Sequence, residues 1–202
     1  MQKAITGQKR VWVVGSSIVK HAFVKARTSY DGVNMGLQRC NATVWWQGQG
    51  GMRWNQLERK LTYLLTFEDP PDYLVLHCGG NDIGHVKSIK LRKQMEQTMK
   101  NIRNKFPKTC IIWSQILPRF EWRSKIASCH LNKIRIRINR AMAKAALRSG
   151  GAYIRYPELS VENPGFFGDD KVHLTCTGND VFIHHMQEAL LSFLTTNKSV
   201  YP

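Results

Sequence analysis

Acidic side chains, long apolar runs and paired cysteines are all scarce in this sequence of 202 residues. Only 14 Asp and Glu stand against 30 Lys and Arg, which gives a formal net charge of +16. No apolar run approaches the roughly 18 residues that span a bilayer. The first apolar run is interrupted by Gly15, Ser16 and Ser17 and lacks a signal-peptidase pattern, so we expect no signal peptide and a cytoplasmic location.

The five cysteines are widely spread, contain no Cys-x-x-Cys pair and are odd in number. They make a poor disulfide framework, and we interpret them as reduced thiols. Because His184 and His185 are adjacent on a predicted helix and point apart, we expect no metal site. The chain also lacks repeats, low-complexity tracts and linkers, so we predict a single domain over residues 1–202, with a core of about 10–195 and frayed ends.

What the chain does contain is a regular alternation of strand-like and helix-like segments. Short runs rich in Val, Ile, Tyr and Trp predict strands over residues 10–15, 42–47, 73–78, 110–116 and 152–156. Segments with helical spacing of apolar residues predict helices over residues 18–28, 53–66, 86–105, 125–148 and 178–194. The strands are almost continuously apolar, which is typical of a parallel sheet buried on both faces. We therefore predict a doubly wound α/β fold with five parallel strands in the flavodoxin-like order 2-1-3-4-5 and helices on both faces.

In such a sheet, ligands bind at the carboxyl ends of the strands. Gly15-Ser16-Ser17 follows the first predicted strand, and Gly50-Gly51 follows the second. A glycine turn with a serine as helix N-cap would explain the first motif without any catalytic role. The later segments add the groups that acyl transfer needs: a serine nucleophile, a histidine base, a carboxylate that orients the base, and N–H donors for the oxyanion.

Those later segments are Gly79-Gly80-Asn81-Asp82 after the third strand and Asp170-Lys171-Val172-His173 after the fifth. With Gly15-Ser16-Ser17-Ile18 and Gly51, they make the chain resemble the SGNH or GDSL-type hydrolases, because four motifs occur in the family's order from residue 11 to about 194. The resemblance implies Ser17 as nucleophile, His173 as base and Asp170 as its orienting group. It implies that the N–H of Ser17, Gly51 and Asn81 form the oxyanion hole, with Gly50 as an alternative to Gly51 and Asp169 as a rival to Asp170. No cofactor is implied.

The sequence departs from the family at one position, where Ser16 replaces the aspartate of Gly-Asp-Ser-Leu. The triad survives this change, but loss of the carboxylate can loosen the turn and reduce activity. Within the superfamily, the sequence as a whole resembles the esterase domain in the first-frame protein of some vertebrate LINE retrotransposons and its fish and amphibian relatives.

The positive charge is concentrated in one part of the chain. Residues 87–148 hold 17 Lys and Arg but only Glu96 and Glu121 as acids. One stripe with helical spacing comprises Lys133, Arg137, Arg140, Lys144 and Arg148. In the predicted strand order the helices after strands three and four are neighbours. They would form a polyanion-binding surface for RNA, DNA or anionic membrane, the alternative being a solvated charged face.

The sequence therefore predicts a serine esterase that acts on lipid or short acyl esters and carries a basic face. Two alternatives stay open: a binding module with a weak or inactive site, and a deacetylase or transferase that acts on carbohydrate.

Overall fold

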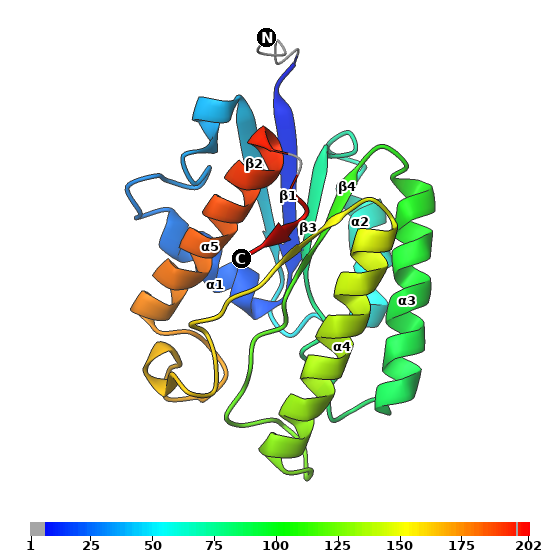
Figure 1. Ribbon diagram of the computed structural model, residues 1–202, viewed down its shortest axis with the longest axis vertical. Coiled ribbons are helices and arrows are strands. Elements are labelled where there is room, and N and C mark those ends of the chain that lie inside the picture. Colours follow the sequence, from blue (N-terminus) through cyan, green and yellow to red (C-terminus); the bar gives the residue numbers. More distant parts are fainter. Residues whose placement is uncertain (1–6, 197) are drawn as a thin grey trace.

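The computed structural model describes residues 7–196 and 198–202, in which six parallel strands form one sheet (Figure 1). The strands are β1 (Lys9–Gly15), β2 (Ala42–Gly48), β3 (Tyr73–His77), β4 (Cys110–Ser114), β5 (Ala152–Ile154) and β6 (Val200–Tyr201). Their order is β2-β1-β3-β4-β5-β6, and every neighbouring pair is parallel. The first five strands thus have the predicted order.

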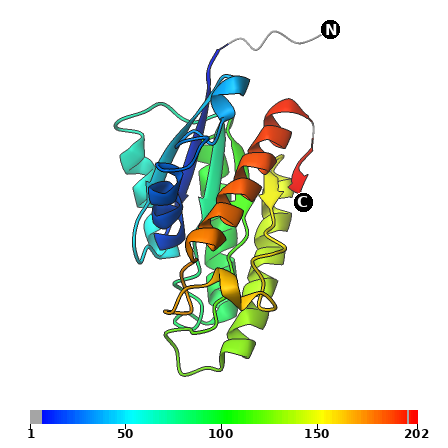
Figure 2. The same cartoon turned by 90° about the vertical axis from the view of Figure 1, so that its left-hand side faces the viewer.

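The helices cover both faces of the sheet (Figures 1 and 2). They are α1 (Ser17–Ala26), α2 (Leu57–Leu64), α3 (Ser88–Lys105), α4 (Ser128–Arg148) and α5 (Cys176–Thr195). Short 3₁₀ turns occur at Leu37–Cys40, Trp54–Gln56 and Pro164–Phe166. Figure 2 looks onto the face covered by α1 and α5, while α2, α3 and α4 pack on the opposite face.

The alternation of side chains along β1 explains these two layers. Val11 and Val13 point into the cluster that α1 and α5 cover, whereas Trp12 and Val14 point into the cluster beneath α2, α3 and α4. All four side chains are at most 1 % exposed. Since burial of a large apolar side chain contributes roughly 2 kcal/mol, this central strand anchors both cores.

The sixth strand corrects the expectation that the C-terminal tail is frayed. Residues Val200–Tyr201 pair with Tyr153 and Ile154 of β5, and the N–H of Arg155 donates to the Tyr201 carbonyl oxygen over 2.7 Å. Two residues in a polar tail carry too little apolar periodicity to predict a strand. At the other end, residues 1–6 lie outside the described residues.

The carboxyl ends of the strands meet at the lower end of the sheet in Figure 1, and the loops after them are collected there. Of the helices described within residues 7–196 and 198–202, none is both long and apolar enough to cross a bilayer.

Candidate active site

Ser17 is the first residue of α1 and follows β1 by a single residue. Gly15 makes this sharp turn possible, because a Cβ there would lie 2.3 Å from the carbonyl oxygen of His77 on the neighbouring strand. Ser16 occupies the N-cap position, yet its buried side chain forms no capping hydrogen bond. The side chain of the N-cap serine therefore does not cap α1.

The hydroxyl of Ser17 instead contacts a histidine that lies 156 residues further along the chain. Ser17 Oγ is 2.8 Å from His173 Nε2. On the other side of the ring, His173 Nδ1 is hydrogen bonded to Asp170 Oδ2. The structure thus places the three predicted catalytic residues in one chain of hydrogen bonds, in the arrangement of a Ser-His-Asp triad.

The loop between β5 and α5 gives Asp170 its position. Lys171 adopts a left-handed conformation with φ of 59°, which folds the backbone of the next two residues onto the carboxylate. Asp170 Oδ1 accepts hydrogen bonds from the N–H of His173 over 2.9 Å and of Val172 over 3.0 Å. The rival residue Asp169 is exposed and forms no side-chain hydrogen bond among the described residues.

The pKa of Asp170 follows from these contacts. Partial burial opposes ionisation of the carboxyl group, but the hydrogen bonds from His173 and Val172 and the nearby imidazole outweigh it and lower the pKa of Asp170 to about 2. Asp170 is therefore an anion at neutral pH and holds Nδ1 of His173 as the protonated nitrogen. Nε2 then faces Ser17 as the acceptor, which is the tautomer that a general base needs.

The predicted oxyanion donors lie on the two loops next to Ser17. Asn81 Nδ2 donates to the carbonyl oxygen of Met52 over 3.0 Å and so ties the loop after β3 to the loop after β2. A carboxamide has a second N–H, which this bond leaves free. Gly51 precedes Met52, is exposed and has a φ of 69°. The choice between Gly50 and Gly51 as donor stays a prediction.

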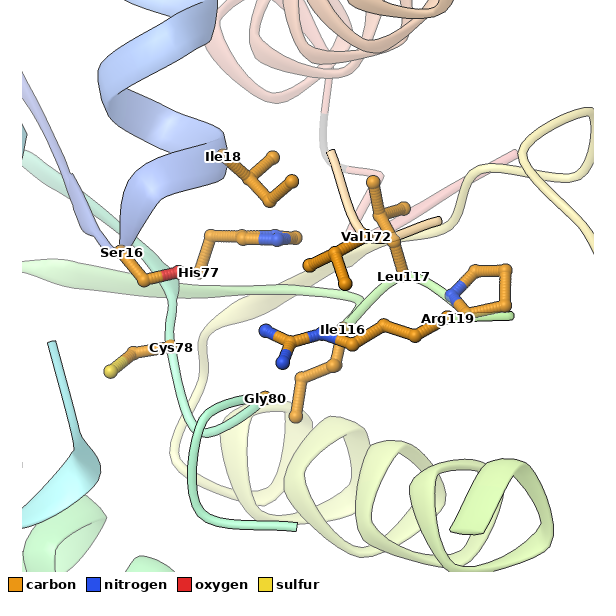
Figure 3. A pocket seen from close by; sticks show the side chains of 10 residues that line it. Ser16, Ile18, His77, Cys78, Gly80, Ile116, Leu117, Arg119 and Val172 are labelled. Carbon is orange, nitrogen blue, oxygen red and sulfur yellow. The ribbon is translucent and has the colours of Figure 1, made fainter. Parts of the chain in front are cut away.

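A small pocket opens beside the nucleophile, between the loops after β1, β3, β4 and β5 (Figure 3). Its polar lining comes from Ser16, His77 and Arg119, and its apolar lining includes Ile18 and Val172. Ile18 and Val172 are the chain neighbours of Ser17 and His173. The pocket therefore adjoins the triad, although its empty volume of about 290 Å³ includes space open to solvent.

The floor of this pocket is a neutral histidine. His77 is 3 % exposed, and its Nδ1 is 2.9 Å from Ser114 Oγ, which in turn lies 2.7 Å from the hydroxyl of Tyr156. Burial, assisted by the charge of Arg119, lowers the pKa of His77 to about 3. His77 is therefore a neutral packed side chain at physiological pH.

Two side chains that the sequence analysis left out contact the site. His21 lies one helical turn after Ser17, and its ring centroid is 4.6 Å from that of His173. Burial first, and the neighbouring His173 second, lower the pKa of His21. Arg119 lies in the loop after β4, and its Nη2 donates to Asn81 Oδ1 over 2.9 Å. The position of Arg119 after the fourth strand, at the carboxyl edge of the sheet, could have indicated that it lies near the site. The four-residue spacing of His21 from Ser17 could have indicated that both side chains lie on one face of the helix.

The predicted basic stripe lies on the outer surface of α4, away from the sheet. All five residues Lys133, Arg137, Arg140, Lys144 and Arg148 are exposed. Helices α3 and α4 pack against each other. Among the described residues, only one of the 17 cations between 87 and 148 is in an ion pair, Arg92 with Glu96 at 3.6 Å. Within the same described part of the chain, no cluster of three or more His, Cys, Asp or Glu side chains suits a metal ion.

The model of the GDSL-like lipase/acylhydrolase family matches residues 13–181. This chain belongs to that family. A search of curated proteins found no match.

Solved structures of low sequence identity share the fold. One described as a GDSL-like lipase, from Parabacteroides merdae, has a TM-score of 0.69 at 15 % identity and covers 97 % of this chain and 100 % of its own. A structure described as an acylhydrolase, from Bacteroides fragilis, has a TM-score of 0.68 at 18 % identity and covers 95 % of this chain and 92 % of its own. An acetylxylan esterase from Geobacillus stearothermophilus has a TM-score of 0.65 at 11 % identity and covers 92 % of this chain and 95 % of its own. At such identities the likeness is one of fold, so the chemistry of the GDSL-like chain rests on its own residues.

Proposed function

We propose that this protein is a serine esterase that hydrolyses lipid or short acyl esters. The observation that carries the proposal is the continuous contact from Ser17 Oγ through the ring of His173 to the carboxylate of Asp170. A serine hydroxyl is a weak nucleophile until a base removes its proton, and this chain of contacts supplies such a base with its orienting anion. Membership of an acylhydrolase family supports the same class of reaction.

The first half-reaction transfers the acyl group to the enzyme. Ser17 Oγ attacks the ester carbonyl carbon while His173 Nε2 accepts the hydroxyl proton, and Asp170 stabilises the imidazolium ion that forms. The carbonyl oxygen becomes an oxyanion, which accepts hydrogen bonds from the backbone N–H of Ser17, the N–H of Gly51 and the free N–H of Asn81. His173 then protonates the alcohol as it leaves, and an acyl-serine remains.

The second half-reaction uses water. His173 takes a proton from a water molecule, which attacks the acyl-serine through a second tetrahedral intermediate held by the same donors. Collapse of this intermediate releases the acid and restores the Ser17 hydroxyl. Each step uses groups of the chain and water alone.

The experiment that tests this proposal compares two neighbouring serines. Ser17→Ala removes the nucleophile, and we expect hydrolysis of p-nitrophenyl acetate and butyrate to fall to background, a loss of up to about 10⁶-fold in kcat. Ser16→Ala is the matched control, because Ser16 is buried beside Ser17 but forms no hydrogen bond with His173 among the described residues. Undiminished turnover by Ser17→Ala would refute the proposal.

The exposed cations on α3 and α4 support a second part of the proposal, a phosphate-binding surface next to the esterase site. Of the 12 Lys and Arg on α3 and α4, ten are exposed, and only Arg92 has a carboxylate partner among the described residues. Binding of RNA, DNA or anionic membrane to them would be sensitive to salt and independent of sequence.

A binding module with a weak or inactive site is the second candidate function. It is favoured by Ser16, which stands where the family has an aspartate, together with the unpaired basic surface. This candidate would be selected if the wild-type protein binds polyanions but does not hydrolyse esters. The deacetylase or transferase alternative predicts instead that acetylated sugars are better substrates than simple esters. The narrower resemblance to LINE retrotransposon proteins stays a prediction from the sequence.

A further inference from the structure

Arg119 stands out because its guanidinium is partly buried in the pocket beside the triad without an ion pair among the described residues. Figure 3 shows its side chain reaching across the pocket from the loop after β4 towards Gly80 and the turn at Ser16. Burial lowers the pKa of Arg119 to about 10, and the group remains a cation at neutral pH. Such a group is costly unless it has a specific partner.

The surroundings hold this side chain in one place. The guanidinium carbon lies 5.0 Å from the ring centroid of Trp122, and Trp122 Nε1 donates to the Arg119 carbonyl oxygen over 3.1 Å. Asn132, on α4, donates to the same carbonyl oxygen over 2.8 Å. Gly80 leaves room for the guanidinium, because a Cβ at Gly80 would lie 3.0 Å from Arg119 Nη2.

The partner of the guanidinium is the amide of Asn81. Arg119 Nη2 donates to Asn81 Oδ1 over 2.9 Å, and this is the one hydrogen bond of the guanidinium among the described residues. Because the oxygen of the amide accepts from a cation, its nitrogen points the other way, where one N–H donates to Met52 and the second has no partner among the described residues. A charged donor on the oxygen also polarises the amide and makes its N–H groups stronger donors.

We propose that Arg119 is the positioning residue of the oxyanion hole, which fixes and polarises the Asn81 amide so that its free N–H meets the oxyanion. This role rests on the proposed esterase function. Arg119 acts through Asn81 and does not itself touch the reacting atoms. Since the oxyanion exists only in the transition state and the tetrahedral intermediates, the contribution of Arg119 falls on kcat more than on KM.

The test measures kcat and KM of three variants on p-nitrophenyl acetate. Arg119→Gln keeps a neutral N–H donor, and we expect kcat to fall about 10- to 100-fold with KM within about twofold, a smaller loss than that of a complete oxyanion donor. Arg119→Lys keeps the charge and should recover part of the loss. Arg123→Gln is the matched control in the same loop, because Arg123 is exposed. Its kcat and KM should equal those of the wild type. An unchanged kcat in folded Arg119→Gln would overturn the proposal.

A double-mutant cycle separates positioning from a general structural role. If Arg119 acts through Asn81, the double variant Asn81→Ala/Arg119→Gln should be no more than about threefold slower than Asn81→Ala alone. If the losses in kcat of the two single variants multiply in the double variant, the proposal is overturned. It is also overturned if Arg119→Gln and Arg119→Lys lose the same amount of thermal stability. If the wild type shows no Ser17-dependent hydrolysis, the esterase function fails. If the wild type hydrolyses esters but the cycle is additive, only the role of Arg119 fails.

Discussion

The loops at the carboxyl edge of the sheet and the outer surface of α3 and α4 differ in how their polar groups are partnered. At the edge, Ser17, His173 and Asp170 are joined by hydrogen bonds, and Asn81 is held by both Arg119 and Met52. On the helices, only one of the 12 Lys and Arg of α3 and α4 forms an ion pair within the described chain. The edge therefore specifies a geometry, which chemistry needs, while the helices specify only a charge, which suffices for phosphate binding.

After the loss expected for Ser17→Ala, the largest effect should come from the carboxylate that orients the base. Asp170→Asn removes the anion but keeps the size of the side chain, and we expect kcat to fall about 10⁴-fold because the imidazole loses its correct tautomer and its counter-charge. Asp169→Asn is the matched control, since Asp169 is the exposed neighbour without a contact to His173. Steady-state kinetics on p-nitrophenyl acetate measure both, and equal losses in the two variants would refute the assignment of Asp170.

A smaller effect is expected on the basic surface. The double reversal Arg137→Glu/Arg140→Glu places two acids in the stripe on α4, and affinity for single-stranded RNA should fall roughly 10- to 100-fold at low salt, with a shallower salt dependence. Ester hydrolysis should not change, because these side chains point away from the active edge. Fluorescence anisotropy against RNA, with retention on anionic vesicles as a second arm, measures the change. If binding to both is unaltered, the basic surface is only a solvated face.

Acid stability should distinguish the floor of the active pocket from the surface. His77 has its pKa lowered to about 3 by burial, so the unfolded chain takes up a proton near pH 6.5 while the folded chain does not. The free energy of unfolding should therefore decrease by up to about 1.4 kcal/mol for each pH unit below 6.5 through this group.

Denaturant titrations between pH 7 and pH 5 test this effect of His77. His77→Phe should show a smaller decrease than the wild type, whereas the exposed control His85→Phe should follow the wild type. Parallel curves for the wild type and His77→Phe would contradict the buried neutral state of His77.

The smallest predicted effect decides between the two glycines after β2. Gly51 has a φ of 69°, in which an alanine is strained by about 1–2 kcal/mol. Gly51→Ala should consequently lower kcat several-fold by shifting the backbone N–H, while Gly50→Ala, with an ordinary φ, should not. The opposite result would place the donor at Gly50.

The elements that the sequence predicted correctly are those with strong local patterns. The apolar runs of β1 to β5 predicted a parallel sheet, because such a sheet is buried on both faces. Together with the alternating helices they indicated a doubly wound fold, whose usual strand order the first five strands adopt. Ser17, Asp170 and His173 were predicted as a set from motifs, and the structure brings their side chains together.

The features that the sequence did not predict depend on how distant loops fold. The link of Arg119 to Asn81 needs the loops after β3 and β4 to converge, and the contact of His21 with His173 joins α1 to a loop about 150 residues away. The missing cap at Ser16 is similar, since the hydroxyl faces a pocket that four loops build. Such contacts leave no periodic signal in the sequence.

The most direct test of the central claim is to find which side chain reacts with a fluorophosphonate, a reagent that captures activated serines. Mass spectrometry of the digested wild-type protein should find the adduct on Ser17, with labelling lost in Ser17→Ala and in His173→Ala and retained in Ser16→Ala. A folded wild type that stays unlabelled, or an adduct on Ser16, would contradict the assignment of Ser17 as the nucleophile.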